Sequence, residues 1–215
     1  MKKIISAVII AAMALSLAAC AGGSAEPFDY SGYIPDTAES VKTERDDGFT
    51  EMTYRDQDGS QYKLYVDSGN NVRVMKYDSQ QRSTANEVAL TAEEAFSFVT
   101  AVYPNARLVA SASDRDDGGY EWTIIFADGD ILGEYELDAA TGAVLEYTIF
   151  YGITSGTDPV SVITANYPGA EILQLDLGKD DGRLEYEGEA RLDGGVYEFT
   201  IDIDSGKLVE WEAER

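Results

Sequence analysis

The sequence contains no histidine, a single cysteine and few basic residues, with 16 lysines and arginines against 40 aspartates and glutamates. Without histidine the chain lacks the commonest general base, the usual zinc ligand and the ordinary serine or cysteine triad. One cysteine cannot form an intramolecular disulfide, so the fold depends on packing. A net charge of −24 also argues against nucleic-acid binding, which requires basic surface.

These absences leave little room for catalysis. Paired carboxylates such as Glu93 and Glu94 resemble those that hydrolyse glycosides, but adjacent acids arise by chance in so acidic a chain. No phosphate-binding loop of the Gly-Lys-Ser/Thr type is present either. We therefore expect a protein that is not an enzyme and carries no cofactor.

The N-terminal residues have the pattern of an export signal. Lys2 and Lys3 precede an apolar run, residues 4–17, that is too short for a comfortable membrane span. Small residues and Cys20 follow, an order that resembles a bacterial lipobox, in which the cysteine becomes the first mature residue and carries lipid. We expect lipidation at Cys20 and an extracytoplasmic protein anchored to the bacterial cell membrane, with a plain secretory signal as the alternative.

The remaining chain contains an internal repeat without gaps. Tyr103 recurs as Tyr167 and Gly142 recurs as Gly206, each pair 64 positions apart. Duplicated units of this length usually pack on one another, because each alone buries a modest core. The predicted division is a signal peptide (residues 1–19), a tether (20–43), a degenerate β-hairpin repeat (44–80) and two full repeats (88–152 and 155–215).

Each full repeat is predicted to begin with a helix. Thr91 followed by Glu94 is a capping-box pattern, and an apolar stripe then continues until Pro104 ends the helix. In the last repeat Asp158 occupies the N-cap and Pro159 the first helical position. Two different cap chemistries at equivalent points favour the same helix in both repeats.

Strands with alternating apolar and polar residues follow each helix. Residues 120–126 and 197–203 alternate in this way, and turn pairs such as Thr141-Gly142 separate the strands. Residues 49–77 alternate similarly and predict three antiparallel strands without a helix. The expected fold class is α+β, built from tandem repeats of one helix packed on a curved antiparallel sheet.

The order of helix, tight turn, strands and an Asp-x-x-Thr/Ser-Gly turn resembles the PepSY domain. The resemblance depends on residues 93–95, 120–123, 135–145 and 197–208. It covers about residues 90–215, and weakly residues 44–77. It implies a PepSY/cystatin-like fold, related to the tandem scaffold of β-lactamase inhibitor proteins and lipoproteins. It also implies a noncatalytic module that binds or regulates a protein. Because no peptidase domain follows the repeats in this sequence, inhibition of a peptidase is expected to act in trans.

Acidic turns are weak candidates for a metal site. An EF-hand loop requires acids at alternate positions before its glycine and a glutamate six residues after it, and Tyr65 stands where that glutamate should follow Gly59. Hairpin turns therefore explain these acids better than calcium does. A loose surface calcium site remains the alternative, with the candidates Asp116, Asp117, Asp180 and Asp181.

Aromatic residues provide the candidate binding surface. Tyrosine and tryptophan on a sheet are favoured at protein interfaces, although packing against the helix is the simpler explanation, because their strands have apolar neighbours on the same face. The candidates are Tyr120, Trp122, Tyr135, Tyr147, Tyr186, Tyr197 and Trp211.

The predicted function is a lipid-anchored, extracytoplasmic PepSY-type module that binds or regulates another protein. Its expected partner is an extracytoplasmic protein or peptide, such as a secreted peptidase or a basic protein, bound by a concave sheet with acids at its edges. The alternative is an acidic envelope lipoprotein with a structural or Ca²⁺-binding role.

Overall fold

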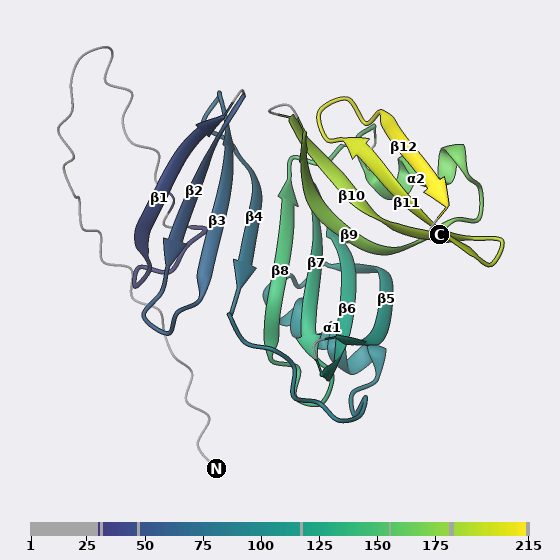
Figure 1. Ribbon diagram of the computed structural model, residues 1–215, viewed down its shortest axis with the longest axis horizontal. Helices are drawn as coiled ribbons and strands as arrows, with labels where there is room; N and C mark the ends of the chain where they lie inside the picture. Colours follow the sequence, from purple (N-terminus) through teal and green to yellow (C-terminus); the bar gives the residue numbers. More distant parts are fainter. Residues whose placement is uncertain are drawn as a thin grey trace.

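The computed structural model describes residues 30, 32–46, 48–116, 118–154, 156–180 and 183–213, in which strands predominate (Figure 1). The helices are α1 (Ala92–Val102) and α2 (Pro159–Asn166). The strands are β1 (Glu39–Asp46), β2 (Phe49–Arg55), β3 (Gln61–Asp67), β4 (Val72–Asp78), β5 (Arg107–Asp116), β6 (Gly119–Asp128), β7 (Ile131–Asp138), β8 (Val144–Tyr151), β9 (Glu171–Asp180), β10 (Arg183–Leu192), β11 (Gly195–Asp202) and β12 (Leu208–Ala213).

The strands form two antiparallel sheets of unequal size. The large sheet has eight strands in the order β1-β2-β3-β4-β8-β7-β6-β5, and the last sheet has four in the order β12-β11-β10-β9. The expected fold class, tandem units of one helix on a curved sheet, is therefore wrong. The molecule is mostly antiparallel sheet, and its two described helices have only 11 and 8 residues.

The large sheet arises because two units join edge to edge. β4 pairs with β8 in antiparallel register, from Val74 opposite Phe150 to Asp78 opposite Glu146. An edge strand exposes unpaired N–H and C=O groups, and joining two edges satisfies both rows. Side-chain alternation in a sequence indicates which residues share a face but does not indicate which edges pair, so this union was not predicted.

The first unit is larger than the sequence predicted. It has four strands rather than three, because residues 39–46 form β1 and pair with β2. Ile34 is buried against the large sheet, with 8% of its surface exposed. Part of the segment interpreted as a tether therefore belongs to the folded body.

The middle repeat (α1 and β5–β8) and the last repeat (α2 and β9–β12) share one strand register. Ile125 of β6 lies opposite Glu134 of β7, and Glu189 of β10 lies opposite Glu198 of β11, each residue 64 positions after its counterpart. The 64-residue offset read from the sequence is thus also the offset of the pairing.

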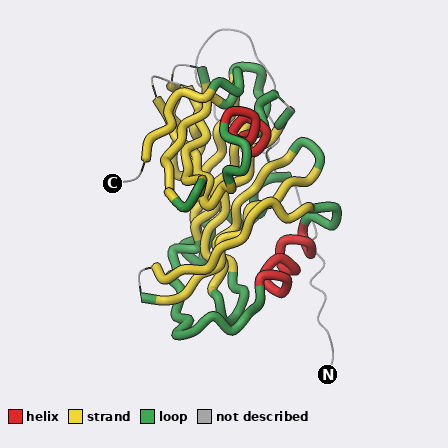
Figure 2. Tube along the Cα trace, turned by 90° about the vertical axis from the view of Figure 1, so that its right-hand side faces the viewer, coloured by secondary structure: helices red, strands yellow, loops and turns green. Residues whose placement is uncertain are grey.

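Two hydrophobic cores lie on opposite faces of the large sheet. Figure 2 shows the two helices well apart from each other. On one face Ala95 and Val99 of α1 pack against strands of the middle repeat. On the other face the last repeat packs against the sheet, and the rings of Phe150 and Tyr186 lie 4.7 Å apart. The last repeat therefore covers the face of the middle repeat that lies opposite α1.

Both helices begin where the sequence predicted. Thr91 and Glu94 form the reciprocal capping box of α1, and Asp158 caps α2 ahead of Pro159. The apolar stripe of α1 is only partly buried, because Val102 is 61% exposed. In the described part of the chain, neither helix has the length and apolar character needed to cross a membrane.

An aspartate shapes the turn before the final strand of each unit. In each turn the aspartate carboxylate accepts a hydrogen bond from a backbone N–H two or three residues later. The pairs are Asp67 with Gly69, Asp138 with Thr141, and Asp202 with Ser205. For Asp138, burial alone raises the pKa, but hydrogen bonds from Thr141 and Ser83 outweigh it and lower the pKa to about 2. These bonds explain the Asp-x-x-Thr/Ser-Gly pattern at the second and third turns.

Candidate functional site

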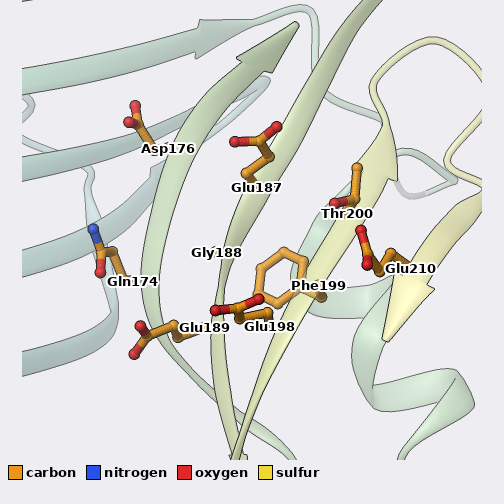
Figure 3. A pocket seen from close by; sticks show the side chains of 9 residues that line it. All are labelled: Gln174, Asp176, Glu187, Gly188, Glu189, Glu198, Phe199, Thr200 and Glu210. Carbon is orange, nitrogen blue, oxygen red and sulfur yellow. The ribbon is translucent and has the colours of Figure 1, made fainter. Parts of the chain in front are cut away.

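The face of the last sheet turned away from α2 is acidic and hollow. We call it the acidic face and define it by Asp176, Glu187, Glu189, Glu198 and Glu210 (Figure 3). With Gln174 and Thr200 these side chains line an open hollow of about 370 Å³. Glu187, Glu198 and Glu210 are exposed to solvent.

Strand alternation gathers these acids on one side. Glu198 of β11 lies opposite Glu189 of β10 and opposite Glu212 of β12, and Glu187 lies opposite Asp176 of β9. Like charges directly opposite one another destabilise a sheet. The carboxylates on this face therefore repel one another, and they contribute no packing that would offset this repulsion.

Few cations compensate this charge within the described residues. Asp176 binds Lys76 of the large sheet, with Nζ 2.7 Å from Oδ1. Glu187, Glu198 and Glu210 form no ion pair with any described residue. With neither a histidine nor a thiol nearby, the chemistry this face offers is attraction of positive charge and acceptance of hydrogen bonds.

A second acidic group lies at the junction of the two sheets. Glu134 of β7 is buried, 5% exposed, and its Oε2 accepts the backbone N–H of Leu175 on β9 at 2.7 Å. Burial raises the pKa of Glu134 well above its usual range; Glu136 and Asp176 raise it further, while the Leu175 N–H and Lys76 act in the opposite direction. This carboxyl group therefore holds an edge strand of the last sheet on the large sheet.

The predicted aromatic surface is divided between the two sheets. Tyr186 has no exposed surface and Tyr135 is 5% exposed, whereas the other five predicted residues are half-buried. Tyr147 stacks on Tyr135 with ring centroids 5.0 Å apart, and Trp211 stacks on Tyr197 at 4.9 Å. The remaining two, Tyr120 and Trp122, lie on β6. Tyr135 and Tyr186 are thus core residues that a partner cannot reach.

The other predicted sites lie largely beyond what the structure describes. Cys20, Asp117 and Asp181 fall outside the described residues, and of Asp116 only the backbone is described. Asp180 is exposed at the end of β9. Among the described residues, no three side chains of histidine, cysteine, aspartate or glutamate are grouped closely enough to hold a metal ion.

The acids of the acidic face were not among the predicted site residues. Their signal was present as the alternation of Glu198, Thr200 and Asp202 with apolar residues along β11. The sequence predicts a concave sheet with acids at its edges, but alternation along one strand does not indicate which acids of the neighbouring strands lie beside it. Only the pairing of four strands shows that acids from β9, β10, β11 and β12 meet at one hollow.

Comparison with known protein families gives one match in each of the two full repeats. The profile of the PepSY family, described as "Peptidase propeptide and YPEB domain", matches residues 89–148 and 160–212. The YpeB C-terminal domain of Bacillus megaterium is 13% identical, with 86% of this chain and 93% of that chain covered and a TM-score of 0.36. A predicted lipoprotein of Clostridium difficile 630 is 16% identical, with 60% of this chain and 96% of that chain covered and a TM-score of 0.30.

No curated protein matches the chain. The two matched segments lie within the two full repeats and together cover more than half of the sequence. The chain belongs to the PepSY family.

Proposed function

We propose that this protein is a noncatalytic, extracytoplasmic PepSY module that binds a basic region of another protein on its acidic face. One observation carries the proposal: Glu187, Glu198 and Glu210 stand exposed around one hollow without a described cationic partner. A basic partner would relieve the repulsion between the facing carboxylates. Complementary charge of this kind also accelerates association and selects among partners.

The proposed location depends on the N-terminal sequence. Lys2 and Lys3, the apolar run and Cys20 are the signals for export and lipidation. Lipid at Cys20 would keep an acidic protein at a membrane surface whose anionic lipids repel it. A secreted peptidase is one candidate partner, because the family description includes peptidase propeptides.

The test compares two variants with equal loss of charge. In the full-length protein, Glu187, Glu198 and Glu210 are replaced by glutamine; the control replaces Glu39, Glu87 and Glu93, which are exposed away from the acidic face. Crosslinking in the producing cells, followed by mass spectrometry, identifies the bound proteins. We expect a basic partner that the wild type and the control retain and the face variant loses.

Two results would contradict the proposal. One is a set of crosslinked proteins that is identical for the wild type and the face variant. The other is an equal loss in both triple variants, which would mean that total charge, rather than this face, governs association. Folding of each variant is checked by circular dichroism before crosslinking.

A further inference from the structure

The molecule contains an occupied counterpart of its own acidic face. Glu134 and Glu198 occupy equivalent positions, because Glu134 lies opposite Ile125 and Glu198 lies opposite Glu189 in the shared register. In each repeat this face is the one turned away from the helix. The middle repeat therefore shows how such a face holds a polypeptide.

In the middle repeat the occupant is an edge strand. β9 lies at the edge of the last sheet and lies against β5, β6 and β7. The N–H of Leu175 points out of its own sheet and donates to Glu134 at 2.7 Å. Beside it Asp176 of β9 binds Lys76 of β4 at 2.7 Å. One backbone hydrogen bond and one ion pair thus accompany the apolar packing.

The same position is open in the last repeat. Glu198 is exposed, and no described residue hydrogen-bonds to its carboxylate. Where the middle repeat has Ile125, the last repeat has Glu189. The arrangement keeps the hydrogen-bond acceptor and replaces apolar contact with negative charge.

We propose that the acidic face binds an extended basic segment edge-on, with Glu198 accepting a backbone N–H as Glu134 does from Leu175. Lysine or arginine side chains of the segment pair with Glu187 and Glu210 on either side. This mode of binding deepens the proposed function and depends on it.

A second copy of the chain does not fit this face. The chain has a net charge of −24, and its equivalent edge strand, β9, carries Glu171, Asp176 and Asp180, so two copies would repel each other. The middle repeat tolerates β9 because its own face offers Ile125 and Phe150 to the packing. The occupant of the acidic face is therefore a basic segment of a different protein.

The test uses a short capped peptide that alternates lysine and threonine, which favours an extended chain with cationic side chains. Its twin carries N-methyl groups at alternate residues, which remove backbone N–H donors and keep every charge. Calorimetry measures the dissociation constant of each peptide for the full-length protein, for Glu198→Ala and for the control Glu93→Ala. Glu93 is an exposed acid on α1, so its loss changes the charge equally.

We expect the wild type and the Glu93 variant to bind the unmodified peptide about tenfold more tightly than its N-methylated twin. We expect Glu198→Ala to bind both peptides equally and weakly. If Glu198→Ala and N-methylation change nothing while the peptide still binds in a salt-dependent way, the edge-on mode is wrong and the proposed function stands. If neither peptide binds the wild type, both the mode and the basic partner are wrong.

Discussion

In the middle repeat the face opposite the helix is covered by β9, whereas in the last repeat the same face is open to solvent. The strand register is identical, so the backbone does not cause the difference. Side chains cause it: Ile125 and the neighbouring Phe150 lie in the core of the covered face, and Glu189 stands where Ile125 would be. The comparison shows that the same face of a duplicated sheet can form an internal contact between repeats or a solvent-exposed surface.

The aspartates of the turns give the largest expected difference between the two repeats. Asp138 is 5% exposed and accepts hydrogen bonds from Thr141, Ser83 and Thr84, so it ties the segment between β4 and α1 to the turn. Asp202 accepts hydrogen bonds from the backbone N–H and the hydroxyl of Ser205, which lies within its own turn. Replacing Asp138 by alanine should lower the free energy of unfolding by roughly 3 kcal/mol, because buried donors lose their partner, against about 1 kcal/mol for Asp202→Ala.

Urea denaturation of both variants measures this difference. Because its folded-state pKa is lowered to about 2, Asp138 contributes stability above its unfolded pKa that is lost as the pH falls through about 2. The variant should therefore lack this acid-dependent loss. Equal destabilisation by the two substitutions would show that the hydrogen bonds of Asp138 with Ser83 and Thr84 contribute nothing.

Glu134 and Glu198 provide the next comparison. Replacing Glu134 by alanine leaves the buried Leu175 N–H without an acceptor and should cost about 2 kcal/mol of unfolding free energy. Replacing exposed Glu198 by alanine should change it by less than about 0.5 kcal/mol. Thermal unfolding of the two variants measures both effects.

The pH dependence of Glu134 has a definite sign. A pKa raised by folding means that its stabilising contribution is present below the unfolded pKa and is lost as the pH rises through the folded pKa. The charged groups facing it are Glu136, Asp176 and Lys76. Glu134→Gln keeps an acceptor without ionising, so it should become more stable than the wild type as the pH rises. A constant difference across the pH range would contradict this.

Much of the local structure could be predicted from single residues. Thr91 with Glu94, and Asp158 with Pro159, located both helix starts, since capping depends on neighbours a few positions away. The 64-residue offset likewise located equivalent strands. Short-range chemistry and repetition were sufficient for these features.

The assembly of the sheets and the site could not be predicted. The pairing of β4 with β8 and the docking of β9 depend on contacts between distant segments, such as Lys76 with Asp176 and Glu134 with Leu175. Alternation places Tyr186 and Glu198 on opposite faces but does not indicate which face is covered. The large apolar surface that makes the aromatic candidates suitable for an interface also buries two of them, Tyr135 and Tyr186, in the cores.

The smallest expected difference concerns Trp122 and Tyr186, which occupy equivalent positions in the two repeats. The indole Nε1 of Trp122 donates to the carbonyl of Leu90 at 3.1 Å, whereas the buried hydroxyl of Tyr186 has no hydrogen-bond partner among the described residues. Tyr186→Phe should therefore leave the free energy of unfolding unchanged or raise it slightly, while Trp122→Phe should lower it by about 1 kcal/mol. Urea denaturation of both variants measures the change in the free energy of unfolding and its direction. A loss of stability in Tyr186→Phe would show that its hydroxyl forms a hydrogen bond in solution. The equivalent polar groups of the two repeats would then both be hydrogen-bonded.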